Sequence, residues 1–125
     1  MKLLLDTHIL LWVMQDADAL STRARARIAA ADEVYISSVV LWELAIKVGL
    51  GKLKLDLAAL DRQLEGSALM PLPITWAHTA TLRQLPGHHR DPFDRMLVAQ
   101  AISEPMHLLT HDAALAAYTP LVTVV

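Results

Sequence analysis

The sequence LLLD, residues 3–6, opens the chain with a short apolar run that ends on an acid. A continuous run of this length, without polar alternation, is typical of a β-strand buried on both faces of a parallel sheet. Four later segments are also predicted to be strands: 34–36, 70–74, 107–110 and 121–125. Pro71 and Pro73 place the third of these five strands at an edge, because proline cannot donate to a strand ladder.

The segments between these strands have helical patterns. Helices are predicted over 8–15, 23–31, 39–48, 57–64, 75–85, 91–103 and 113–117. Asp18 or Ser21 can cap the second helix, and Pro92 takes the favoured first position of the sixth. Strands that alternate with helices predict the α/β class. We expect a single domain over residues 1–125, with a central parallel sheet of about four to five strands flanked by helices.

The composition excludes several classes of protein. The chain has 125 residues, of which 54% are hydrophobic, and it contains no cysteine. A chain of this length can bury a core without disulfides, and thiolate metal sites are excluded. Asp6 interrupts an apolar run already too short for a signal peptide, and no uncharged stretch approaches the roughly 20 residues of a membrane helix. We therefore expect a soluble, unprocessed, cytoplasmic protein with no membrane contact.

The charge balance does not by itself indicate a nucleic-acid-binding protein. The formal net charge is −2, from 11 basic and 13 acidic residues, whereas such proteins usually carry a basic excess. Any nucleic acid would have to meet a local basic patch or bound cations. Five basic residues could line such an approach, and a solvated surface explains them equally well: Lys47, Lys52, Lys54, Arg90 and Arg95.

Four acidic residues are expected at one edge of the sheet, because the carboxyl ends of parallel strands meet there. Asp6 directly follows the first strand, and Asp112 lies just beyond the fourth. Glu43 lies just over one turn into the helix after the second strand. Asp94 begins a helix that leads by a short connection into the fourth strand, so its end of the helix lies beside the end of that strand. The sequence therefore predicts four carboxylates in one crevice.

Each of these acids also has a purely structural explanation. Asp6 and Asp112 could cap the helices that follow them. Asp94 stands in the first turn of its helix, where a negative charge interacts well with the helix dipole. Glu43 could pair with Lys47 one turn later on a solvated face. Taken singly, these explanations are as good as a functional one.

Taken together, the four acids favour a metal site. Glu43 lies within the segment 39–46, where nearly every neighbour is apolar, and a carboxylate buried there needs a partner. Four crowded carboxylates also repel one another and raise each other's pKa values. A divalent cation would relieve both problems. Oxygen ligands without cysteine suit Mg²⁺, with Mn²⁺ as a plausible substitute, better than zinc.

The histidines and tryptophans are interpreted structurally. None of the six histidines belongs to an H-E-x-x-H motif, so a histidine metal site is not expected. The loop 88–90 could touch phosphate, although a solvated loop is at least as good an interpretation. Trp12, Trp42 and Trp76 lie in apolar stretches and are assigned to the core or to an interface rather than to base stacking.

Four sequence motifs resemble those of the PIN-domain nucleases, in the same order and over nearly the whole chain. These motifs are LLLDTH with LLW (3–8 and 10–12), ISS with LWE (36–38 and 41–43), DPFDR (91–95) and LLTHD (108–112). In pattern they resemble the VapC-like toxins of type II toxin–antitoxin pairs, in the subgroup often partnered with Phd/YefM-type antitoxins.

The resemblance implies a magnesium-dependent endoribonuclease that forms a homodimer and is held inactive by a small cognate antitoxin. It places the family's metal-binding and catalytic acids on Asp6, Glu43, Asp94 and Asp112. The chemistry would be hydrolysis of an RNA phosphodiester with one or two Mg²⁺ ions. Asp6 and Asp94 would bind metal directly, Asp112 directly or through water, and Glu43 would orient a metal-bound water or a second ion.

Four further residues accompany the acids without a settled role. Thr7, Thr110 and Arg95 could support the site through hydrogen bonds, and helix capping or surface pairing explains them equally well. Asp91 is an extra acid that could be a cap or an outer-shell ligand.

Two other classes of function stay open. A receiver-like or phosphatase-like domain also gathers acids and Mg²⁺ at a strand edge, with Asp6 as a phosphoryl acceptor. In that case the motifs around Glu43 and Asp94 would be unexplained. The domain could instead act chiefly by binding its antitoxin, with weak or absent cleavage.

Overall fold

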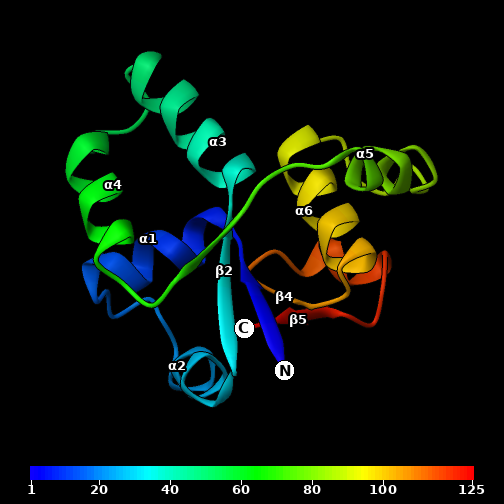
Figure 1. Ribbon diagram of the computed structural model, residues 1–125, viewed down its shortest axis with the longest axis horizontal. Helices are drawn as coiled ribbons and strands as arrows, with labels where there is room; N and C mark the ends of the chain where they lie inside the picture. Colours follow the sequence, from blue (N-terminus) through cyan, green and yellow to red (C-terminus); the bar gives the residue numbers. More distant parts are fainter.

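Five short strands form one parallel sheet through the centre of the molecule (Figure 1). The computed structural model describes residues 1–125. The strands are β1 (Lys2–Leu5), β2 (Glu33–Ser37), β3 (Met70–Leu72), β4 (His107–Thr110) and β5 (Val122–Val124). Their order in the sheet is β3-β2-β1-β4-β5, and every neighbouring pair is parallel. The predicted α/β class is confirmed, with β3 at an edge as its prolines require.

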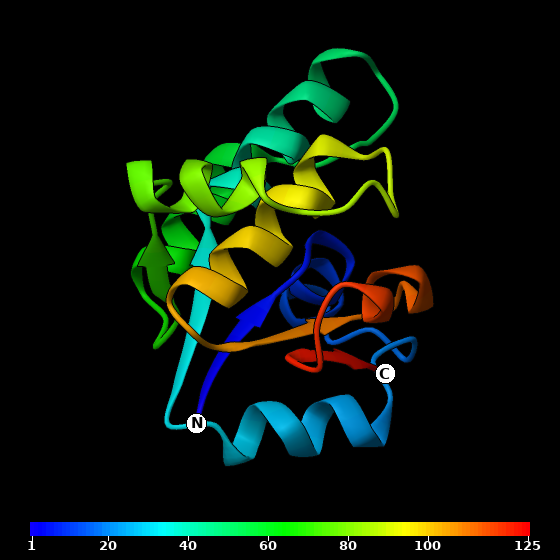
Figure 2. The ribbon, with the colours of Figure 1, turned by 90° about the vertical axis from the view of Figure 1, so that its right-hand side faces the viewer.

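Six α-helices and one 3₁₀ helix connect the strands. They are α1 (Thr7–Gln15), α2 (Thr22–Ala30), α3 (Ser38–Gly49), α4 (Leu57–Glu65), α5 (Trp76–Arg83), α6 (Pro92–Ser103) and η1 (Ala113–Ala117). In Figures 1 and 2, α1 and α4 lie on one side of the sheet, α5 and α6 lie on the other, and α3 extends beyond the end of β2. None of these helices combines the length and the apolar character needed to span a membrane.

The central strand β1 is buried on both faces. Leu3, Leu4 and Leu5 are 1%, 0% and 0% exposed and belong to the main hydrophobic core. In the strand predicted over 34–36, Ile36 is buried whereas Val34 and Tyr35 are only half-buried. Val34 and Tyr35 are less buried because the edge strand β3 is short. It begins opposite Tyr35 and leaves the start of β2 without a neighbouring strand on that side.

The boundaries of most elements match the sequence prediction to within one or two residues. Ser21, rather than Asp18, caps α2, and its hydroxyl accepts the N–H of Ala24 at 3.1 Å. The strand predicted over 70–74 ends at Leu72, because Pro73 has no N–H for the ladder.

The assignment of the tryptophans to the core was wrong for two of the three. Trp12 is half-buried against the core, but Trp42 is 57% and Trp76 93% exposed. The apolar sequence of α3 is distributed all round the helix, so its outer face leaves Ile46 and Leu50 exposed as well. The alternative assignment of these residues to an interface stays a prediction.

Candidate active site

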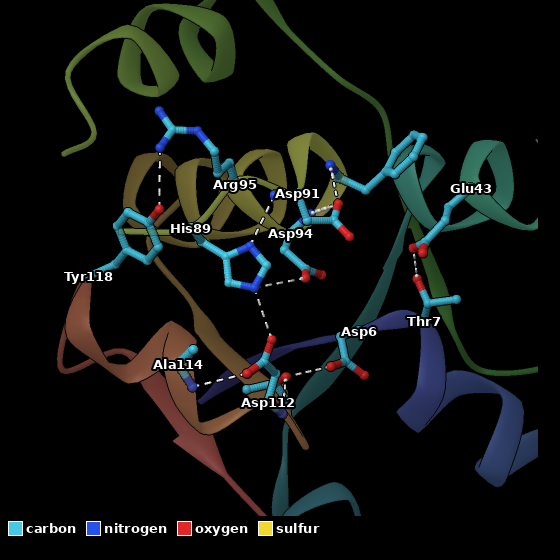
Figure 3. Close-up of polar contacts among 12 residues, drawn as sticks. Asp6, Thr7, Glu43, His89, Asp91, Asp94, Arg95, Asp112, Ala114 and Tyr118 are labelled. Atoms are coloured by element: carbon cyan, nitrogen blue, oxygen red, sulfur yellow. Dashed lines mark hydrogen bonds and ion pairs between the residues drawn. The ribbon is translucent and has the colours of Figure 1, made fainter. Parts of the chain in front are cut away.

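The first of the predicted acids, Asp6, lies at the junction of β1 and α1 (Figure 3). It is 5% exposed and caps α1, where its Oδ1 accepts the N–H of Ile9 at 2.9 Å. Its Oδ2 accepts the hydroxyl of Thr110, which stands at the end of the neighbouring strand β4. Burial raises the pKa of Asp6, and the hydrogen bond from Thr110 opposes this rise.

Asp112 lies two residues beyond Thr110 at the same edge of the sheet. Its Oδ1 accepts the N–H of Ala114 at 3.0 Å and caps η1, while Oδ2 lies 3.1 Å from Nε2 of His89. The hydroxyl of Thr110 accepts the backbone N–H of Asp112 at 3.0 Å, so this one threonine contacts both acids. Asp6 and Asp112 are therefore helix caps, as the structural explanation held, and they also stand side by side at the strand ends.

Glu43 lies in the second turn of α3 and is 6% exposed. Its Oε1 accepts the hydroxyl of Thr7, and its Oε2 pairs with Nζ of Lys47 at 2.8 Å. The hydrogen bond with Glu43 raises the pKa of Lys47. The pair with Lys47 was one of the two interpretations of Glu43, but Glu43 itself is buried in it rather than solvated, while Lys47 is 39% exposed. The protein thus supplies part of the partner that the buried carboxylate needs.

Asp94 stands in the first turn of α6, and its side chain is 22% exposed. Burial, followed by the nearby charges of Asp91 and Glu43, raises the pKa of Asp94 from 3.8 to about 7. The charge of Asp6 contributes in the same direction, and His89 opposes it. Asp94 is therefore a carboxyl group whose surroundings leave its negative charge poorly compensated.

Asp91 acts as the N-cap of α6. Its Oδ1 accepts the N–H groups of Phe93 at 2.9 Å and Asp94 at 3.2 Å. The predicted cap is confirmed, and a role for Asp91 as an outer-shell ligand stays a prediction. Its charge nevertheless reaches Asp94, because it contributes to the raised pKa of that residue.

The structure brings two of the four predicted acids within ligating range of each other, together with one histidine. The ligand atoms of His89, Asp94 and Asp112 all lie within 4.8 Å of one another. Asp6 and Glu43 are outside this group and hold hydrogen bonds of their own. Both are still close enough for their charges to raise the pKa of Asp94.

His89 is the residue that sequence reasoning missed. It was assigned to a loop that is solvated or touches phosphate, because it belongs to no helical metal motif. Its contact with Asp112 joins segments 23 residues apart, which no local spacing reveals. The only available signal was its position just before Asp91 and the helix that carries Asp94.

The expected supporting residues divide into two groups. Thr7 and Thr110 hydrogen-bond to the acids, as described above. Arg95 does not, because its guanidinium donates to the carbonyl of Pro86 at 2.9 Å and to the hydroxyl of Tyr118 at 3.2 Å. It holds the loop before α6 in place. Of the other basic residues that could line an approach for nucleic acid, Lys47 is paired with Glu43. The remaining three are exposed: Lys52, Lys54 and Arg90.

The donor set fits a hard divalent cation. The charged donors are carboxylates, the chain has no cysteine, and burial together with the charges of Asp91 and Glu43 raises the pKa of Asp94, so a bound cation would stabilise its charged form. Asp6 is less suited to accept a phosphoryl group, because it is 5% exposed and both of its oxygens are engaged. The geometry therefore favours a metal site over a receiver-like phosphorylation site.

Residues 3–119 match the PIN domain, and the chain belongs to this family. It is 31% identical to Ribonuclease VapC22 of Mycobacterium tuberculosis (strain ATCC 25618 / H37Rv) over 114 residues, which are 90% of this chain and 88% of that protein.

Solved structures show the same fold. The crystal structure of VapBC2 from Rickettsia felis, bound to a DNA fragment from their promoter, matches with a TM-score of 0.73 and 22% identity, over 100% of this chain and 98% of that chain. A toxin–antitoxin complex from Klebsiella pneumoniae matches with a TM-score of 0.65 and 18% identity, over 97% of this chain and 95% of that chain.

Proposed function

We propose that this PIN-domain protein is a magnesium-dependent endoribonuclease and the toxin of a type II toxin–antitoxin pair. The observation that carries the proposal is the crowding of acids around Asp94, whose pKa burial and neighbouring carboxylates raise to about 7. The similarity to Ribonuclease VapC22 supports RNA as the substrate. The gathering of these acids at one place supports a role beyond helix capping.

Asp94 and Asp112 would hold the cation together with Asp6, and Glu43 would orient a water molecule beside it. Mg²⁺ is the proposed ion, and Mn²⁺ a substitute. When bound, such an ion supplies positive charge for the phosphate and lowers the pKa of a coordinated water. The same residues would hold a second ion if the reaction uses two.

The remaining side chains prepare the acids for this role. Thr110 and Thr7 fix the carboxylates of Asp6 and Glu43 through hydrogen bonds from their hydroxyl groups. Lys47 pairs with Glu43 and is 39% exposed, so its ammonium group can meet the phosphate backbone without leaving the site. These contacts explain how a chain with a net charge of −2 can approach RNA.

A small antitoxin, of the Phd/YefM type by sequence resemblance, is the proposed partner, and the toxin is proposed to form a homodimer. Similarity to the VapBC2 and Klebsiella pneumoniae complexes supports the antitoxin. The exposed apolar face of α3 supports the dimer, because Trp42, Ile46 and Leu50 are 57%, 39% and 65% exposed. Light scattering should give the mass of a dimer for the wild type and of a monomer for Leu50→Glu. A monomeric wild type would contradict the dimer.

The proposed activity can be separated from helix capping by asparagine substitutions. Asparagine caps a helix as well as aspartate does, but it has no negative charge for a cation. Asp6→Asn and Asp112→Asn should therefore keep their caps, and Asp94→Asn removes no cap. All three variants should fold and lose cleavage of purified total RNA, measured on gels with Mg²⁺ and with EDTA. Asp56→Asn is the matched control, because Asp56 caps α4 outside the acid cluster and its Oδ1 accepts the N–H of Ala59 at 3.1 Å.

The expected result is cleavage by the wild type and by Asp56→Asn in Mg²⁺, and none in EDTA. Equal cleavage by the wild type and Asp94→Asn would overturn the metal mechanism. If no variant and no preparation of the wild type cleaves RNA while the antitoxin still binds, the protein is a binding module instead.

A further inference from the structure

His89 occupies a position between two of the acids, although it comes from the loop before α6. Its Nε2 lies 3.1 Å from Oδ2 of Asp112 and 3.8 Å from Oδ2 of Asp94. Asp112 caps η1, whereas Asp94 lies in the first turn of α6. Figure 3 shows the ring between them, on the side of the cluster away from Asp6 and Glu43.

The hydrogen bonds of the ring assign its proton. Nδ1 of His89 accepts the backbone N–H of Asp91 at 3.0 Å, so the hydrogen of the neutral ring is on Nε2. Nε2 therefore donates to Asp112. To bind a metal through Nε2, the ring would have to carry its proton on Nδ1, directly opposite the N–H of Asp91. The local backbone thus favours a hydrogen-bond donor at this position over a metal ligand.

The donated hydrogen bond holds the second oxygen of the Asp112 carboxylate. The side chain of Asp112 is 42% exposed, compared with 22% for Asp94. Its Oδ1 is held by the N–H of Ala114, and only His89 holds Oδ2. Each carboxylate oxygen keeps a second lone pair for a cation. Hydrogen bonds of this kind, from a neighbour to a metal-binding side chain, typically contribute about 10- to 100-fold to metal affinity.

We propose that His89 is a positioning residue, which orients Asp112 for the divalent cation by donating from Nε2 and does not itself bind the ion. The proposal rests on the proposed function of the acid cluster. It predicts that a side chain able to donate from the same place can replace the imidazole. Glutamine is such a side chain, because its Nε2 amide can donate a hydrogen bond and is a poor metal ligand.

The test is calorimetric titration of the RNA-free protein with Mn²⁺ and with Mg²⁺. Four proteins are compared: the wild type, His89→Ala, His89→Gln and His88→Ala. His88 is the matched control, because it is the exposed neighbour in the same loop and packs its ring against Tyr118 rather than against an acid. Thermal unfolding of all four in EDTA shows whether any variant has lost its fold.

His89→Ala should bind both ions about 10- to 100-fold more weakly, His89→Gln should recover most of this loss, and His88→Ala should match the wild type. Unchanged or tighter binding by His89→Ala would overturn the proposal. It would also be overturned if His89→Gln binds as weakly as His89→Ala with an intact fold, because the ring would then be a ligand. If the wild type itself binds neither ion, the proposed metal site fails first, and the role of His89 falls with it.

Discussion

Replacing Asp94 by asparagine should stabilise the protein in EDTA, and the gain should grow with pH. The raised pKa of Asp94, about 7, means that the folded protein holds this proton more tightly than the unfolded chain, whose value is 3.8. Between these two values, the unfolded chain releases the proton while the folded protein retains it. The free energy of unfolding therefore falls as the pH rises through this window, and the loss is complete above pH 7.

The size of the effect follows from the two pKa values. One pKa unit corresponds to about 1.4 kcal/mol, so the full difference is worth about 4 kcal/mol at pH 8. At pH 5 only part of this destabilisation of the wild type by Asp94 is present. The stability advantage of Asp94→Asn over the wild type should therefore be about 2–3 kcal/mol larger at pH 8 than at pH 5. Asp6 also has a raised pKa, but it titrates in both proteins and largely cancels from this difference.

The assay is urea unfolding of both proteins at pH 5 and pH 8 in EDTA, with the free energies extrapolated to zero urea. In saturating Mn²⁺ at pH 8, the stability advantage of Asp94→Asn over the wild type should shrink or reverse. A cation bound only to the wild type adds about 2.7 kcal/mol at a concentration of 100 times its Kd. An advantage of Asp94→Asn that is the same at both pH values would refute the argument that this carboxylate is poorly compensated.

Three further substitutions test other parts of the structure. Thr7→Val removes the hydroxyl group that donates to the buried Glu43; it should lower the free energy of unfolding in urea by about 1–3 kcal/mol and reduce RNA cleavage, and full retention of both would contradict the contact. His78 is fully buried and pairs with Glu104. His78→Ala should therefore lower the free energy of unfolding by about 2–4 kcal/mol, measured by differential scanning calorimetry, without changing the affinity for Mn²⁺. A loss under about 1 kcal/mol would contradict a stabilising role for this pair. Leu109→Ala in β4 should cost about 3–5 kcal/mol in urea, because Leu109 is 0% exposed, and a smaller cost would show that the core collapses into the cavity.

The parts of the fold that depend on local patterns could be predicted from the sequence. The apolar run of β1 and the alternation of strands and helices define the parallel sheet. Simple topology then places Asp6 and Asp112 at the strand ends. It also brings Asp94 to the same edge, since α6 leads directly back into β4.

The parts that depend on long-range packing could not be predicted. No local spacing indicates that His89 reaches Asp112, because the contact depends on how the loop before α6 folds over the strand ends. The exposure of Trp42 was also missed, because an apolar sequence does not say which helix face the rest of the chain covers. The pair between the buried Glu43 and the partly exposed Lys47 combined two interpretations that the sequence had treated as alternatives.

The central claim is that the acids around Asp94 bind a divalent cation, and the most direct test is to locate that cation. Crystals of the protein grown with Mn²⁺ would show it in an anomalous difference map. We expect a peak in contact with carboxylate oxygens of Asp94 and Asp112 and next to Asp6, and its loss in Asp94→Asn. A map from fully loaded crystals with no peak at this edge of the sheet would show that these acids do not bind the cation.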